Sequence, residues 1–278
     1  MQIKNKHILT MLVVAGISAA ALPANAATFV AGDLLLGFRA TGGLGSTSNL
    51  LVNLGQADTV FRDATSNLAS VTNIGALLTS TYGANWASRD DLFWGAVGVR
   101  TNSSLGPAVD GDPVRTNYVT AAQTTYGPGT QQSSAWNIAG GTGRADIANA
   151  IAGLQTTFDN DTLSPGTTST VIDSSTANSW TLGIADNNFK VGGAIEASNV
   201  NGIDETGLDL YRILNTTTGA VPTGTVGLGS YEGTLKISTA GVVGFDVSPA
   251  VIPEPSRAML AALGLGGLLL RRRRSAKA

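Results

Sequence analysis

The chain has 278 residues, no cysteine, a single histidine (His7) and a formal net charge of −2. These absences exclude disulfides, a thiolate nucleophile and cysteine-ligated metals, and beyond His7 they exclude a Ser-His-Asp triad, a histidine-ligated zinc and a histidine general base. Residues 27–250 hold nine Lys and Arg against eighteen Asp and Glu, a net charge of about −9 that should repel nucleic acid and anionic membrane surfaces.

The N-terminus has the pattern of a secretory signal peptide. Two lysines precede an apolar stretch from residue 8 to residue 22, and Ala24 and Ala26 supply the small residues of a cleavage site. We expect signal peptidase to cut between Ala26 and Ala27 after export by the general secretion machinery. A short N-terminal anchor is the alternative, and the cleavage site argues against it.

Strand and helix patterns follow one another over the first half of the body. Residues 33–41 and 50–54 are predicted as buried strands, and the glycine-rich residues 42–45 between them predict a hairpin. Ile74, Leu77 and Leu78 have helical spacing, which predicts a helix over 73–82 that ends at Gly83. Another buried strand is predicted over 91–100.

The second half of the body contains one further predicted helix and several strands. Residues 103–129 are rich in turn-forming residues, and Ile147, Ile151 and Leu154 have the spacing of a helix over 144–158. Residues 159–179 are rich in Asp, Ser and Thr and predict an exposed loop. Strands are predicted over residues 180–184, 190–196, 208–214, 233–238 and 242–247.

These elements predict a mainly β fold. Many short strands and about two short helices indicate a sandwich-like body of antiparallel or mixed sheets. A body of about 225 residues is long enough to bury one sizeable core. We therefore divide the chain into a signal peptide over 1–26, a β-rich exported domain over 27–250 and a C-terminal segment over 251–278.

The C-terminal segment combines three features in a fixed order. Pro253, Glu254 and Pro255 come first, an uncharged apolar run over 258–270 follows, and Arg271, Arg272, Arg273 and Arg274 end the pattern. As a helix the run would rise roughly 20 Å, against about 30 Å for a bilayer core, so it is a weak permanent anchor. The basic cluster should stay on the cytoplasmic side of the membrane. A plain tail anchor is the alternative interpretation.

This arrangement resembles the PEP-CTERM sorting signal over residues 253–274. The resemblance implies a Gram-negative bacterial protein recognised by an exosortase, an integral-membrane cysteine transpeptidase or protease. It also implies transient anchoring in the inner membrane, followed by transfer to the cell surface or to an extracellular polysaccharide matrix. Under this interpretation Pro253, Glu254 and Pro255 serve the chemistry of another enzyme.

Three acidic clusters in predicted loops are candidates for Ca²⁺ binding, because alternating carboxylate oxygens suit this ion. None has the complete EF-hand pattern, and solvated turn carboxylates are the alternative. The clusters are Asp110-Gly111-Asp112, Asp159-Asn160-Asp161 and Asp204-Glu205.

Paired carboxylates can also hydrolyse glycosidic bonds without histidine. Asp90, Asp91, Asp110 and Asp112 are the candidates for an acid and a base. Asp90 and Asp91 are also interpreted more simply as the polar residues that lead into a strand.

Aromatic side chains offer a third kind of site. Trp94 and Trp180 lie in apolar strand patterns, which favours core packing, whereas Trp136 lies in a loop rich in Gln, Ser and Gly. Trp136 is therefore the candidate for stacking on a sugar.

The leading hypothesis is a non-enzymatic exported protein without a cofactor, with a structural or adhesive role among exopolysaccharide, as in a biofilm matrix. A carbohydrate-binding module is the first alternative and a carboxylate-dependent glycosidase the second.

Overall fold

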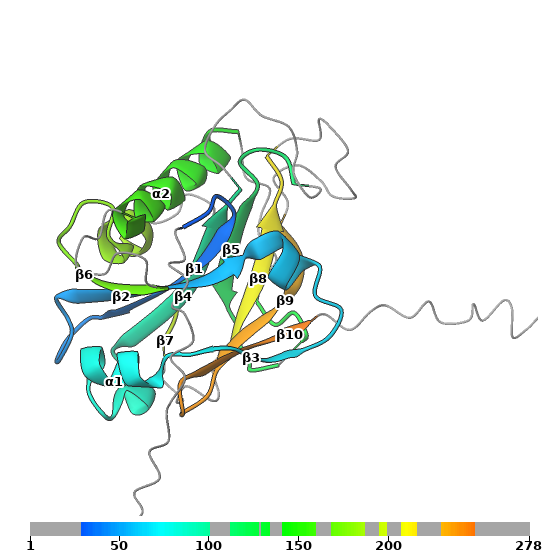
Figure 1. The fold of residues 1–278 in the computed structure, drawn as a ribbon. Coiled ribbons are helices and arrows are strands. Elements are labelled where there is room, and N and C mark those ends of the chain that lie inside the picture. Colours follow the sequence, from blue (N-terminus) through cyan, green and yellow to red (C-terminus); the bar gives the residue numbers. More distant parts are fainter. Residues whose placement is uncertain are drawn as a thin grey trace, which may run out of the picture.

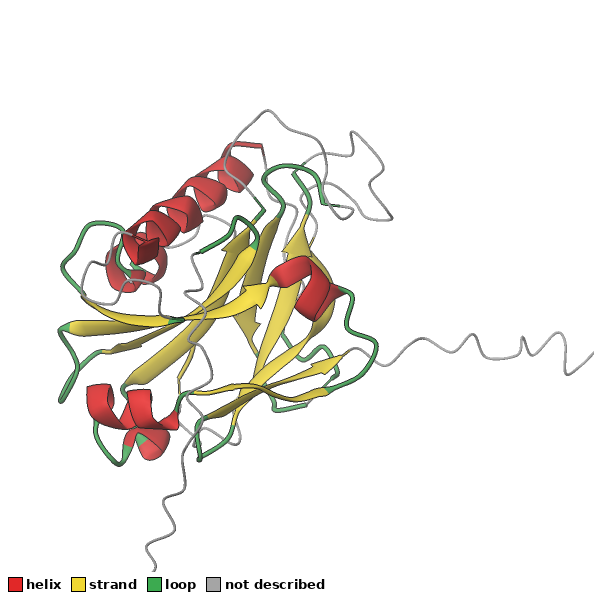
Figure 2. Cartoon of the chain, in the orientation of Figure 1, coloured by secondary structure: helices red, strands yellow, loops and turns green. Residues whose placement is uncertain are grey.

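A computed structural model describes residues 29–100, 112–127, 129–133, 141–159, 168–186, 195–198, 207–215 and 229–247. Strands dominate this part of the chain (Figure 2). The elements in chain order are β1 (Asp33–Ala40), β2 (Ser48–Gln56), η1 (Ala57–Arg62), β3 (Leu68–Asn73), α1 (Gly75–Tyr82), η2 (Trp86–Ser88), β4 (Leu92–Val99), β5 (Asn117–Ala122), α2 (Gly141–Asp159), β6 (Ser169–Asp173), η3 (Trp180–Ala185), β7 (Ala197–Ser198), β8 (Gly207–Ile213), β9 (Gly229–Ile237) and β10 (Val242–Val247). The elements labelled η are short helical turns.

The ten strands form one antiparallel sheet that curls into a half-barrel (Figure 1). The strand order is β3-β10-β9-β8-β5-β4-β1-β2-β6, and β7 pairs with β4 beside β5. The curl brings distant strands together. Phe61 of η1, which directly follows β2, packs edge-on against Phe245 of β10 with ring centroids 5.2 Å apart. The predicted mainly β body with antiparallel pairing and two helices is confirmed, but its strands form one curled sheet and not a sandwich-like arrangement of sheets.

Each face of the sheet carries its own hydrophobic core. The inner core contains Phe38, Trp94 and Phe245 and is filled from the open side by η1 and α1. The outer core lies beneath α2 and η3, and its sheet residues include Leu35 and Val97. Since central strands such as β1 bury side chains on both faces, their sequences are continuously apolar rather than alternating.

A pair of facing glycines makes room for an indole in the outer core. Gly37 of β1 lies directly opposite Gly95 of β4, and the buried ring of Trp180 lies on both. A Cβ atom added at Gly37 would lie 2.0 Å from this ring, and one added at Gly95 would lie 3.0 Å from it. The two glycines are thus required by packing.

The predicted hairpin of β1 and β2, both predicted helices, and the strands corresponding to β4, β8, β9 and β10 are confirmed. Three predictions were incomplete or wrong. Residues 180–184 form the helical turn η3, because Trp180 must lie flat on the glycine pair. The predicted loop over 159–179 contains β6, and the turn-rich stretch over 103–129 contains β5. Ile195 and Glu196, the described end of the predicted strand over 190–196, precede the short strand β7.

Candidate functional site

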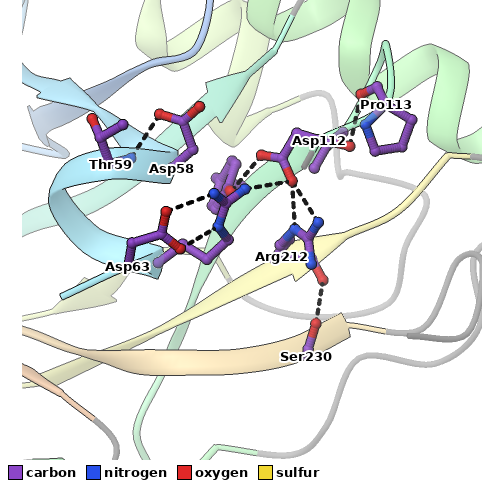
Figure 3. A network of polar contacts seen from close by, with 10 residues as sticks. Asp58, Thr59, Asp63, Asp112, Pro113, Arg212 and Ser230 are labelled. Carbon is purple, nitrogen blue, oxygen red and sulfur yellow. Dashed lines mark hydrogen bonds and ion pairs between the residues drawn. The ribbon is translucent and has the colours of Figure 1, made fainter. Parts of the chain in front are cut away.

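A buried ionic centre lies at one end of the inner face (Figure 3). Its middle is Asp112, which is fully buried just before β5. Arg212 of β8 donates from Nε to Asp112 Oδ1 over 2.7 Å, and its Nη2 lies 2.6 Å from the same oxygen. Tyr118 of β5 donates its hydroxyl to Asp112 Oδ2 over 2.6 Å. Both carboxylate oxygens are therefore engaged inside the protein.

Arg62 joins this centre to the surface at the end of η1. Its Nη1 lies 3.0 Å from Asp112 Oδ1, while Nε and Nη2 donate to the two oxygens of Asp63, each over 2.8 Å. The hydrogen bonds from Arg62 lower the pKa of the Asp63 carboxyl below its ordinary value. Two guanidinium groups thus face two carboxylates, so the charges of this group balance.

A third carboxylate, that of Glu232, lies at a β-bulge in β9 beside the ionic centre. The register between β8 and β9 passes from Leu210 opposite Gly233 to Tyr211 opposite Tyr231, and Glu232 is left without a partner. Tyr231 packs against the outer core, whereas the site of a Cβ on Gly233 faces the Phe245 ring of the inner core. Ser230 lies directly opposite Arg212 on the inner face, and Glu232 follows the outward-facing Tyr231, so Glu232 shares the face of Ser230. There it interacts electrostatically with both arginines and Asp112.

Burial is the largest influence on the pKa values of two groups in this centre, Glu232 and Tyr118. It raises the pKa of Glu232 to about 7, although the arginines act in the opposite direction. It also raises the pKa of the Tyr118 phenol, an effect that the Asp112 charge increases. The centre can therefore hold a proton on Glu232 close to neutral pH, while Tyr118 remains a neutral hydrogen-bond donor.

A second buried carboxylate anchors a loop on the outer side of the sheet. Asp209 Oδ2 accepts hydrogen bonds from the backbone N–H groups of Gln132 and Ser133 over 2.8 and 2.7 Å, and from the Ser133 hydroxyl over 2.8 Å. Its Oδ1 accepts from Gln123 Nε2 over 2.7 Å. Because Asp209 is fully buried on β8, these bonds fix both ends of residues 123–133 against the sheet.

A third polar group ties the segment before β7 to the outer face. Glu196 accepts two hydrogen bonds from Arg39 Nε, each over 2.9 Å, and one from Arg39 Nη2 over 2.7 Å. It also accepts the indole N–H of Trp180 over 2.7 Å. The Arg39 guanidinium lies over the Phe93 ring, 5.0 Å from its centroid. This geometry satisfies the polar atom of a buried tryptophan and has the character of a structural clamp.

The carboxylates predicted for glycosidase chemistry lie in different surroundings. Asp112 is 0% exposed and committed to arginine and tyrosine, so it does not suit an acid that must reach a substrate. Asp91 is held by Arg89 Nε and Nη2 over 2.8 and 2.7 Å, which lowers its pKa, whereas a catalytic acid needs a raised one. Asp90 is exposed before β4, and Asp110 lies outside the described residues.

The structure describes only some of the other predicted site residues. Trp86, Trp94 and Trp180 are buried, as the sequence predicts for the last two, while Trp136 lies outside the described residues. So do Ala24, Ala26, Ala27, Pro253, Glu254, Pro255 and the cluster Arg271–Arg274.

The described ranges contain neither a metal-binding cluster nor a membrane-spanning helix. There, no group of three or more acidic or histidine side chains is arranged to hold a metal ion. Of the predicted Ca²⁺ clusters these ranges include only Asp112 and Asp159, and Asp159 accepts a hydrogen bond from the backbone of Phe29. Within the same ranges, no helix has the length and apolar character needed to span a bilayer.

Several buried charged residues of these groups are not predicted as site residues from the sequence. Arg212 and Asp209 lie inside an otherwise apolar strand, which was a usable signal that both are buried and paired. Glu232 gives no such signal, since its position beside the arginines depends on the pairing of β9 with β8.

Comparison of the chain with family models, with curated proteins and with solved structures finds no match.

Proposed function

We propose that this chain is exported, sorted by an exosortase in a Gram-negative envelope and delivered to the cell surface or to extracellular polysaccharide, where its body acts structurally or adhesively. The observation that carries the proposal is the ordered C-terminal pattern over 253–274, together with the signal peptide pattern over 1–26. The apolar run is short for a permanent span, which favours transient anchoring before cleavage.

The chemistry of the body supports a role without catalysis. The chain has no cysteine and its single histidine is His7, so the commonest nucleophiles and bases are missing from 27–250. Within the described residues, the carboxylates of Asp112, Asp209 and Glu196 accept hydrogen bonds from other parts of the chain, and two of them also form ion pairs. These carboxylates stabilise the half-barrel.

Paired host strains that differ only in the exosortase test the sorting proposal. With the exosortase, we expect an extracellular form that has lost its C-terminal segment; without it, we expect the intact tail in the inner membrane. Pro253→Ala/Pro255→Ala should block processing, whereas Pro249→Ala, a proline outside the motif, should not. Normal cleavage in the strain without exosortase, or equal processing of both variants, would show that the proposal is wrong.

Carbohydrate binding is the second candidate function, with extracellular polysaccharide as the ligand. It is favoured by one observation: Trp86, Trp94 and Trp180 are all buried, so Trp136 is the tryptophan left for an aromatic platform. Because stacking on one aromatic ring contributes about 1 kcal/mol, Trp136→Phe should bind nearly as well as the wild type and Trp136→Ala roughly fivefold more weakly. Equal binding by Trp136→Ala, at an unchanged urea midpoint, would exclude this platform.

A further inference from the structure

Five charged side chains from four parts of the fold meet around the bulge in β9. Arg62 and Asp63 come from the end of η1, Asp112 from the segment that leads into β5, Arg212 from β8 and Glu232 from β9 itself. Tyr118 of β5 and Ser230 of β9 add hydroxyl groups. The neighbouring strand β10 contributes the apolar side chains of Phe245 and Val247 to this face.

The charges in this group balance only when Glu232 is neutral. Arg62 and Arg212 then face Asp63 and Asp112, and every guanidinium has a carboxylate within 3.0 Å. Ionised Glu232 adds a third carboxylate, partly buried and next to the same arginines. An unbalanced charge at such a position is costly because little water reaches it.

We propose that Glu232 is a proton-operated switch at this end of the half-barrel. In mildly acidic surroundings it is uncharged and the Asp112 centre stays intact. In mildly alkaline surroundings it is charged and competes with Asp112 for Arg212, which loosens the contact between η1 and the strands β8 and β9. The strand pairing makes the switch possible, because Ser230 lies opposite Arg212 and alternation along β9 places Glu232 on the same face.

The direction of the effect follows from proton linkage. A carboxyl with a pKa of about 7 in the folded protein, against 4.5 ordinarily, binds its proton more tightly in the folded than in the unfolded chain. The stabilisation is therefore complete below about pH 4.5 and is lost as the pH rises toward and through 7. A histidine would produce a slope in the same range, but the chain has only His7, far from this centre in sequence.

Urea unfolding of the full-length chain at about pH 5.5 and about pH 8.5 tests the switch. Between these conditions the unfolding constant of the wild type should rise roughly 30-fold more than that of Glu232→Gln. Any contribution from His7 is common to both proteins and cancels. Asp90→Asn, which removes an exposed carboxylate, should keep the wild-type response. Equal pH responses of Glu232→Gln and the wild type would overturn the proposal.

A second measurement applies even if Glu232→Gln does not fold. Carbon NMR of the side-chain carboxyl groups in the wild type should show one glutamate that titrates near pH 7. A Glu232 signal with its midpoint near the ordinary value would refute the switch. The protection factors of the Arg62 and Arg212 amides, which correct for the intrinsic rise of exchange with pH, should also be lower at the alkaline condition. Unchanged protection factors there would show that Glu232 does not loosen the centre.

Discussion

Replacement of Asp112 by asparagine tests whether the ionic centre stabilises the half-barrel. The substitution keeps the shape of the side chain but leaves Arg212 and one side of Arg62 facing a neutral amide in a fully buried position. Removing one partner of a buried ion pair costs about 3–5 kcal/mol, a large part of the stability of a typical domain. We expect Asp112→Asn to lower the urea midpoint by a corresponding amount, measured at about pH 6, where Glu232 is mostly protonated.

Asp63 offers a matched control, because it binds the same arginine from the surface. The Asp63 side chain is 55% exposed, whereas that of Asp112 is 0% exposed. Asp63→Asn should therefore cost no more than about 1 kcal/mol. A cost for Asp112→Asn no greater than that for Asp63→Asn would refute the argument that burial makes this centre important. The double variant Asp112→Leu/Arg212→Met should be more stable than Asp112→Asn, since fewer buried charges are left unpaired.

Three further substitutions test other parts of the structure. Gly37→Ala should destabilise the protein by about 1–3 kcal/mol, because the new methyl group would overlap the Trp180 ring. Gly143→Ala in α2 is the control and should be neutral or stabilising, because no atom lies within 4 Å of the position of its new methyl group. Equal urea midpoints for the two variants would contradict the packing of Trp180 on Gly37. Asp209→Ala should cost about 3 kcal/mol and speed amide exchange at Gln132 and Ser133, and unchanged exchange would show that the loop does not depend on this carboxylate. Tyr82→Phe should cost about 1 kcal/mol by thermal unfolding, because the hydroxyl that donates to Phe38 O and accepts from Leu50 N is lost; no change would exclude that role.

The sequence predicts elements whose side chains have a clear local pattern. The apolar runs of β1, β4 and β8 and the helical spacing of Ile147, Ile151 and Leu154 are local signals, and each corresponds to an observed element. β3 and β6 lack such runs, since each lies at an edge of the sheet with several exposed side chains. Their pairing with distant strands determines their conformation.

The ionic centre was less accessible to sequence reasoning than the strands. The sequence points to Asp112 as a candidate Ca²⁺ ligand or glycosidase carboxylate, whereas the structure buries it among partners from positions 62, 118 and 212. Such contacts follow from strand order, and strand order is not written in local periodicity. The curl of the sheet could not be predicted from local periodicity either, because it depends on η1 bridging strands that are far apart in the strand order.

The strand order also determines when the sheet can be completed as the chain folds. β3 (68–73) pairs with β10 (242–247). An early strand can therefore pair only when the last strand of the body is available. Pairing over such a sequence separation is slow, because a very long loop must close first. Only five residues, 248–252, separate β10 from Pro253. A sorting enzyme that acts on the C-terminal motif would therefore act almost at the moment when the last strand becomes available, and early release would leave β3 as an open edge for pairing with other chains.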